Sequence, residues 1–170
     1  LQKERTSFFA KKRKEAEEIQ PKLIPLVDQI ADLTLRGGKR LRPFLCYMGY
    51  EIVLSSQFIV HSKTIKKELL HAMIGLELFH TFALIHDDII DEDNVRRGGQ
   101  TIHEFFRIHA LTHQHITPRN ASHYGISMAI LAGDLALVWA DECMGNVKSL
   151  PAVPLRLSKA SEAGQSSNVK

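Results

Sequence analysis

The sequence predicts an all-α protein. Apolar residues recur every three or four positions through several long segments, a spacing that places them along one face of a helix. No segment shows the strict alternation of apolar and polar residues that is typical of a half-buried strand, and β-hairpin signals are lacking. With 170 residues, 44% of them apolar, the chain has the size and composition of one ordinary globular domain.

Two helices are expected in the first 35 residues. The charged segment 7–20 has an amphipathic pattern that Pro21 ends, and we expect its run of lysines and arginines to face solvent. The segment 22–35 follows, and its apolar residues form a helical stripe. This stripe consists of Leu23, Leu26, Val27, Ile30 and Leu33.

Helical periodicity continues through the rest of the chain, and the longest helix is expected to form the core. Before the last helix, residues such as Thr117 and Pro118 favour a loop. In its block GISMAILAGDLAL, Asp134 is the one charge, and a buried aspartate would need a partner. The further segments are expected at about 40–54, 65–93, 101–109 and 127–141.

Charge and cysteine content exclude several classes of protein. The net charge of +3 predicts neither nucleic-acid nor membrane binding. Cys46 and Cys143 lack the spacing of a disulfide framework, which indicates a reducing, cytoplasmic setting. No apolar run approaches the ~18–20 residues needed to span a bilayer, and there is no signal peptide. We therefore expect a cytoplasmic protein without a transmembrane segment.

An acidic motif ends the expected core helix. Asp87 and Asp91 fall one turn apart on one face, and Asp88 points about 100° away from Asp87. Mg²⁺ binds one or two carboxylates together with phosphate oxygens. A solvated helix end is the alternative, but the acids interleave with Ile89 and Ile90. The motif therefore predicts a metal site.

Basic residues accompany the acidic motif. Arg96 and Arg97 follow it directly, and arginine suits the bidentate binding of phosphate. Earlier, the run GGKRLRP begins at residue 37, and its Lys39 and Arg42 are three apart. They would share a helix face, whereas Arg40 would point elsewhere. The cluster is too compact for a nucleic-acid surface.

One stripe of the core helix changes from apolar to acidic. Leu76, His80, Ala83, Asp87 and Asp91 are spaced four, three, four and four residues apart, so they share a face. His80 is either an ordinary histidine at the rim of the core or a hydrogen-bond donor to a diphosphate. This face predicts an apolar pocket with an ion-binding mouth.

Four blocks of the sequence resemble the trans-type polyprenyl diphosphate synthases, the family of farnesyl and geranylgeranyl diphosphate synthases. The blocks are GGKRLRP, ELFHTFALIHDD with Asp91, RRGGQTIH and GISMAILAGDLAL. The resemblance implies a helical bundle of the isoprenoid synthase type, a Mg²⁺ cofactor and a homodimer. It also implies condensation of isopentenyl diphosphate with an allylic diphosphate, which would be dimethylallyl, geranyl or farnesyl diphosphate.

The resemblance also implies roles for individual residues. Asp87, Asp88 and Asp91 would be catalytic, with the metal held by Asp87 and Asp91. Arg96 would contact the allylic diphosphate. The isopentenyl diphosphate contacts would be Lys39, Arg42, His80 and Arg97.

The length of the product depends on the residues before the acidic motif. Phe82 lies five residues before Asp87, and Phe79 and Ala83 lie beside it in the sequence. In the family, a bulky aromatic residue at this offset stops chain growth early. The resemblance thus implies geranylgeranyl diphosphate (C20), with farnesyl diphosphate (C15) as the second choice, unless both phenylalanines are only core residues.

The resemblance covers the N-terminal part of the family's helical domain. We place this part at residues 1–147 and a polar tail unlike the family at 148–170. The family's second aspartate-rich motif is missing from the chain, so the bundle is expected to be incomplete. A truncated or partner subunit that binds diphosphate without turnover is therefore an alternative. A terpene cyclase is another, although it has no need of GGKRLRP.

Overall fold

The computed structural model describes residues 1–57, 63–114 and 116–148. Over these residues the chain is helical apart from short connections and one small hairpin, so the all-α prediction is confirmed. Nearly all of the predicted polar tail lies outside the described residues, and the domain division stays a prediction. The elements are α1 (Gln2–Ile19), a 3-10 turn η1 (Pro21–Leu23), α2 (Ile24–Leu35), α3 (Leu41–Gln57), α4 (Lys63–Ile90), β1 (Val95–Arg96), β2 (Gly99–Gln100), α5 (Ile102–His113) and α6 (Pro118–Gly145).

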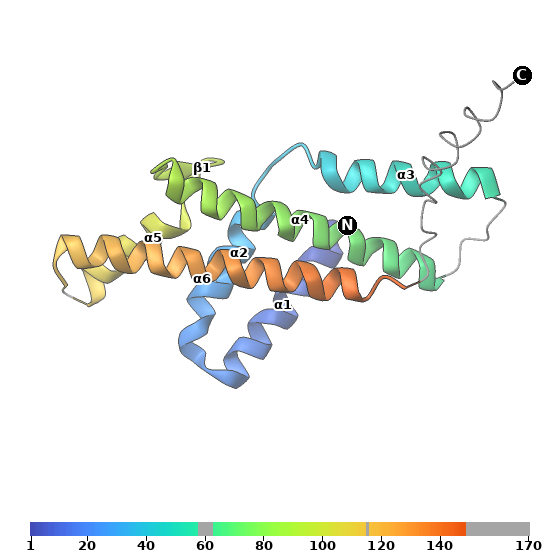
Figure 1. Cartoon of the computed structure of the whole chain (residues 1–170). Coiled ribbons are helices and arrows are strands. Elements are labelled where there is room, and N and C mark those ends of the chain that lie inside the picture. Colours follow the sequence, from blue (N-terminus) through green and yellow to red (C-terminus); the bar gives the residue numbers. More distant parts are fainter. Residues whose placement is uncertain (58–62, 115, 149–170) are drawn as a thin grey trace, which may run out of the picture.

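Helices α4 and α6 lie side by side and antiparallel at the centre of the molecule (Figure 1). Helix α3 packs on α4, and α5 packs on α6. Helices α1 and α2 lie on the other side of the central pair from α3 (Figure 1). The hairpin β1–β2 follows α4, so it lies at the same end of the molecule as the acidic motif.

Two glycines let α4 and α6 approach closely. A Cβ atom at Gly75 would lie 3.2 Å from the carbonyl oxygen of Ala140, a tight contact. A Cβ at Gly133 would collide with the imidazole ring of His86. Small residues at these positions therefore set the distance between the two central helices.

The main core lies among the central pair and helices α1, α2 and α5. The apolar stripe of α2 is buried as predicted, except that Leu23 precedes the helix and is exposed. From α4, Leu78 and Ile85 are almost completely buried. The burial of these side chains supplies the main driving force for packing α2 against α4 and α6.

The prediction that the basic run of the first helix faces solvent is wrong for Lys12. Its side chain is 7% exposed, and its Nζ donates to Glu142 of α6 at 2.6 Å and to Glu15 at 3.1 Å. The same ammonium group lies over the rings of Phe8 and Trp139. A cation in the core is tolerated here because carboxylates and aromatic faces surround it.

The chain forms one hairpin that the sequence did not predict. Strands β1 and β2 pair antiparallel, with Arg96 opposite Gly99. The two residues between them, Arg97 and Gly98, have φ angles of 52° and 75°. Type I′ turns require positive φ at both central positions. The usual Asn-Gly signal is replaced by Arg-Gly, which is why the turn was missed.

Helix α6 begins nine residues earlier than predicted, at Pro118. The hydroxyl of Thr117 accepts a hydrogen bond from the backbone N–H of Asn120 at 3.4 Å. Threonine at the N-cap followed by proline is a helix start signal, although the sequence analysis interpreted it as a loop. Asp134 is exposed on this helix, and its Oδ1 lies 3.8 Å from Nε2 of His86.

Among the described residues, α4 is long and apolar enough to cross a membrane by length and composition. Core helices of water-soluble proteins meet the same criterion. Half of its most apolar stretch is buried inside the structure, and the buried side chains include Glu77 and Asp88. These features are those of a central helix in a bundle.

Candidate active site

Asp87 and Asp91 lie one helical turn apart at the end of α4. The backbone N–H of Asp91 donates to the carbonyl oxygen of Asp87 at 2.8 Å, and both side chains are exposed. Within the described ranges, neither carboxylate takes part in a hydrogen bond or an ion pair. Such a pair fits Mg²⁺, which completes its shell with water and phosphate oxygens. The described residues contain no group of three or more His, Cys, Asp or Glu that could hold a metal.

Asp88 points away from Asp87 and toward the interior of the protein. It is 1% exposed, and its Oδ1 accepts a hydrogen bond from Nε of Arg96. Its Oδ2 is buried without a hydrogen-bond partner, and burial raises the pKa of this carboxyl although Arg96 opposes the shift. The structure therefore does not bring Asp88 to the side chains of Asp87 and Asp91.

Arg96 is held by two carboxylates. Besides its contact with Asp88, its Nη2 donates to Asp93 at 3.2 Å. Within the described residues these bonds use Nε and Nη2, and the side chain as a whole is 24% exposed. The side chain thus has a fixed orientation and retains donors for a ligand.

His80 and Arg97 are in direct contact. Nη2 of Arg97 lies 3.3 Å from Nε2 of His80. Because a guanidinium can only donate, Nε2 of His80 is the acceptor, and the neutral imidazole ring carries its proton on Nδ1. The pKa of His80 is lowered, first by burial and then by the positive charges of Arg42 and Arg97. Three predicted phosphate-binding residues therefore lie close together.

Lys39 belongs to a loop instead of a helix. Helix α3 begins at Leu41, so the expected helix face shared by Lys39 and Arg42 does not form, although both side chains are exposed. The preceding Gly38 packs against Arg97, because a Cβ atom there would lie 3.6 Å from Cζ of the guanidinium. The loop therefore runs directly beside the hairpin.

The three residues predicted to limit chain length lie on α4 at different depths. Phe79 is 52% exposed, whereas Phe82 is partly buried against the core and Ala83 is partly exposed. The ring centroids of Phe79 and Phe82 are 5.7 Å apart. Phe82 also contacts the ring of His86, at 4.9 Å between centroids.

Several ionic residues that shape the site were not singled out from the sequence. Arg36, at the end of α2, donates to the carbonyl oxygens of Arg96 at 3.2 Å and Gln100 at 2.8 Å, which fixes the hairpin. Arg5 and Arg40 converge on the buried Glu77. A glutamate in the apolar part of the core helix was a usable signal, because a buried acid needs a partner.

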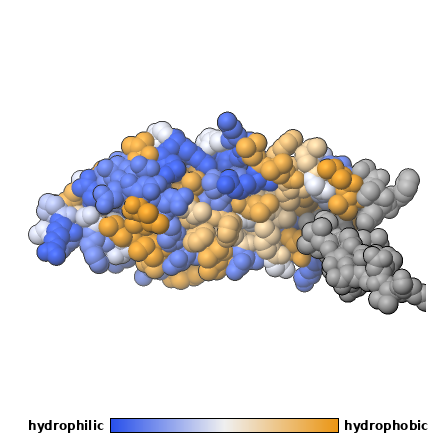
Figure 2. Space-filling model, turned by 45° about the horizontal axis from the view of Figure 1, so that its top comes forward, coloured by the Kyte–Doolittle hydropathy of each residue, from blue (hydrophilic) through white to orange (hydrophobic). Residues whose placement is uncertain are grey.

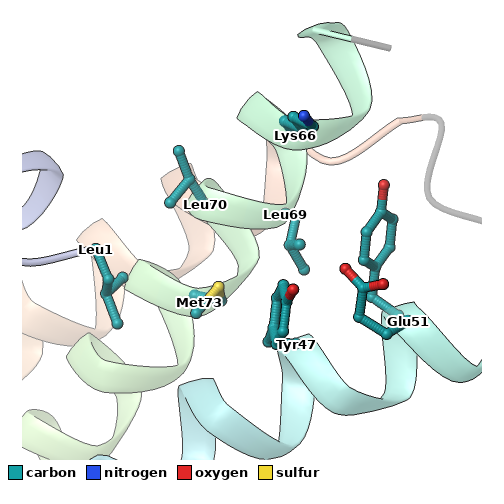
Figure 3. A pocket seen from close by; sticks show the side chains of 8 residues that line it. Leu1, Tyr47, Glu51, Lys66, Leu69, Leu70 and Met73 are labelled. Carbon is teal, nitrogen blue, oxygen red and sulfur yellow. The ribbon is translucent and has the colours of Figure 1, made fainter. Parts of the chain in front are cut away.

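The distribution of hydrophilic residues on the surface agrees with a site at the end of α4 beside the hairpin. Figure 2 shows hydrophilic residues gathered at the end of the molecule where α4 and the hairpin meet, and apolar residues toward α3. A cavity of about 630 Å³ lies elsewhere, between α3 and α4, and Figure 3 shows Tyr47, Leu69 and Met73 around it. It is lined by none of the predicted site residues, so we do not assign the active site to it.

Comparison with known proteins agrees with the motifs. The sequence profile of the family described as polyprenyl synthetase matches residues 24–166. The chain belongs to the polyprenyl synthetase family. The match extends past residue 148, into the segment that the sequence analysis set apart as a tail.

The relatives of this chain include enzymes whose names indicate different products. A short chain isoprenyl diphosphate synthase of Methanocaldococcus jannaschii is 36% identical over 116 residues, which are 68% of this chain and 27% of that protein. A geranylgeranyl pyrophosphate synthase of Geoglobus acetivorans is 36% identical over 64% of this chain and 25% of that protein. The chloroplastic solanesyl diphosphate synthase 2 of Arabidopsis thaliana is 31% identical over 79% of this chain and 27% of that protein.

A solved structure has the same fold. The geranylgeranyl pyrophosphate synthase of Corynebacterium glutamicum, complexed with isoprenyl diphosphate and magnesium, superposes with a TM-score of 0.76 at 29% identity. The match covers 86% of this chain and 40% of that one. The predicted isoprenoid synthase bundle is thus confirmed as the fold, and this chain spans about a quarter of the length of the curated relatives described above.

Proposed function

We propose that the complete protein is a Mg²⁺-dependent trans-prenyltransferase, which condenses isopentenyl diphosphate with an allylic diphosphate. One observation carries this proposal. Asp87 and Asp91 lie at the end of α4 without a hydrogen-bond or ion-pair partner among the described residues, and His80 of the same helix contacts Arg97. Acidic groups for a metal and basic groups for phosphate therefore lie at one end of α4. The family match and the magnesium-bound relative support it.

Asp87 and Asp91 would hold the metal. When bound there, Mg²⁺ supplies positive charge to the leaving diphosphate, which favours ionisation of the allylic C–O bond. Asp88 would not bind the metal directly, because its carboxylate is buried against Arg96. Its contribution would be to hold the guanidinium that we assign to the allylic diphosphate.

The second diphosphate would bind on the basic side of the site. Lys39, Arg42, His80 and Arg97 would contact isopentenyl diphosphate. His80 accepts from Arg97 through Nε2, which leaves Nδ1–H to donate to a phosphate oxygen. Cations that are fixed before the substrate arrives stabilise the anion without reorganisation during the reaction. The double bond of the bound isopentenyl group then attacks the allylic carbon, and a proton is lost.

We infer a short-chain product, geranylgeranyl diphosphate (C20) in the first place and farnesyl diphosphate (C15) in the second. Phe79 and Phe82 would form the floor of the pocket, with Ala83 leaving space beside them. The partly exposed ring of Phe82 and the geranylgeranyl pyrophosphate synthases among the relatives support this choice. The solanesyl diphosphate synthases among the relatives are the competing precedent.

We also infer a homodimer in the cytoplasm. Large apolar side chains are exposed on α3 and α6, among them Phe44, Leu45, Leu131 and Val138. Exposed apolar surface of this extent indicates contact with further protein. The chloroplastic relatives are the competing precedent for the location.

The test is a product assay on the complete protein. Isopentenyl diphosphate and Mg²⁺ are supplied with dimethylallyl, geranyl or farnesyl diphosphate, and the products are separated by chromatography. We expect C20 product from at least one allylic substrate. Consumption of an allylic diphosphate without any use of isopentenyl diphosphate would favour a terpene cyclase instead.

A further inference from the structure

Glu77 is a buried carboxylate between two arginines. Its side chain is 5% exposed, and its Oε2 accepts from Nη1 of Arg5 at 3.2 Å and from Nη1 of Arg40. Arg5 comes from α1 and Arg40 from the loop before α3, so one carboxylate joins three segments of the chain. Glu77 also lies three residues before His80 on α4.

Arg40 makes a second set of contacts. Its Nη2 donates to the carbonyl oxygens of Leu35 at 3.2 Å and Arg36 at 2.5 Å, which are among the unpaired carbonyls at the end of α2. Its φ angle is 50°, a left-handed conformation that costs a non-glycine residue free energy. These contacts of the side chain hold the loop in that conformation.

The charges around Glu77 are otherwise basic. The pKa of Arg97 is lowered first by burial and then by Arg40, and Glu77 opposes this shift. The pKa of Arg5 is likewise lowered by burial and by Arg40, and raised by Glu77. Glu77 is thus the negative charge that allows the guanidinium groups of Arg5, Arg40 and Arg97 to lie near one another.

We propose that Glu77 and Arg40 are positioning residues for the isopentenyl diphosphate site. By fixing the loop at residues 37–40 to the end of α2 and to the middle of α4, they place Lys39 and Arg42 opposite His80. The inference rests on the proposed function and deepens it. The two residues would not contact the substrate, since Arg40 is engaged with protein groups through both terminal nitrogens.

Arg40→Lys is the sharpest test variant. Lysine keeps the charge but has a single terminal nitrogen, so it cannot reproduce the contact of Arg40 through Nη1 with Glu77 and through Nη2 with the α2 carbonyls. We expect the KM for isopentenyl diphosphate to rise about tenfold, with kcat and the KM for the allylic substrate within about twofold of wild type. Glu77→Gln should act in the same direction, because it removes the counter-charge while keeping the shape.

The matched control is Arg13→Lys, which alters an exposed ion pair with Asp28, at 3.1 Å, far from the loop in the sequence. It should leave both KM values unchanged. Binding of isopentenyl diphosphate without metal, measured by calorimetry on the complete protein, supplies a readout independent of turnover. Arg40→Lys should weaken it about tenfold.

Three results would overturn the inference. If Arg40→Lys protein is folded and binds isopentenyl diphosphate as tightly as wild type, or loses affinity equally for both substrates, a positioning role is contradicted. Loss of the cooperative melt in this mild variant would make Arg40 a folding residue. If wild-type protein neither binds nor uses isopentenyl diphosphate, the proposed function itself fails. In that case the Arg13→Lys control would also show no binding and no turnover in the same assay.

Discussion

Arg96 and Asp88 form an ion pair that joins the hairpin to the buried face of α4. The pair draws Asp88 inward, while Asp87 and Asp91 stay exposed on either side of it in the sequence. Three aspartates within five residues therefore have two different environments. The sequence motif alone suggests one acidic cluster, but the structure separates a carboxylate that orients an arginine from two that are available to a metal.

Asp88→Asn should destabilise the protein. It leaves the guanidinium of Arg96 without its buried counter-charge, and the loss of a buried hydrogen-bond partner costs about 1–3 kcal/mol. Urea unfolding measures the change. The control Asp93→Asn removes the exposed partner of the same arginine and should change the free energy of unfolding by less than about 1 kcal/mol. Equal effects of the two variants would contradict the structural role of Asp88.

The fold was largely predictable because helical periodicity is a local signal. The stripe of α2 marks its buried face directly, whereas the stripe expected on α4, from Leu76 to Asp91, is partly or fully exposed. Two of the four motifs lie on helices as expected, but GGKRLRP begins in the loop before α3 and RRGGQTIH contains the hairpin. The missed features depend on contacts between distant segments. Lys12 is buried because Glu142 and Trp139 come from α6, and the hairpin turn uses Arg97 where a more typical sequence would have asparagine.

The site was predictable in its residue types and less so in its geometry. Spacing correctly placed Asp87 and Asp91 one turn apart on an exposed face. The helical spacing assumed for Arg40 does not apply, because α3 begins at Leu41. It could not show that Lys39 precedes the helix, because helix ends depend on capping contacts such as that of Arg40 with α2. Nor could it show that Glu77 and Arg36 fix the two basic segments.

Arg42→Lys should raise the KM for isopentenyl diphosphate by about tenfold, because a point charge cannot replace a bidentate contact with phosphate. The kcat should change little, since this substrate is not the one that ionises. Steady-state kinetics with each substrate varied in turn measures both constants. A rise confined to the KM of the allylic substrate would show that the two diphosphate sites are exchanged.

Stability should fall on acidification because of His80. Its pKa is lowered below the ordinary value of 6.5, so the unfolded chain binds more protons than the folded one between the two pKa values. The free energy of unfolding therefore decreases as the pH falls through this window. His103, whose pKa burial also lowers, adds to the same trend.

The His80 contribution can be isolated by comparing urea unfolding at pH 7.5 and 5.5. His80→Gln should lose less stability over this interval than wild type does. The control His113→Gln, at the exposed end of α5, should lose as much as wild type. A His80→Gln protein with an unchanged pH dependence would contradict the lowered pKa.

Phe82→Ala should lengthen the product. Removing the ring opens the floor of the pocket below Asp87, while the aspartates and the basic residues stay in place. Chromatography of the products should show a shift beyond the wild-type chain length. Because Phe82 also packs against the core, a loss of stability of about 2 kcal/mol is expected as well. An unchanged product distribution in the folded variant would place the floor elsewhere.

The central claim is that Asp87 and Asp91 hold the metal on which ionisation of the allylic substrate depends. The most direct test is the rate of isopentenyl diphosphate condensation in the complete protein, measured with and without Mg²⁺ for wild type, Asp87→Ala and Asp91→Ala. We expect wild-type activity to require Mg²⁺ and each substitution to lower kcat by about a thousandfold or more. Activity of both variants within about tenfold of wild type would contradict the account.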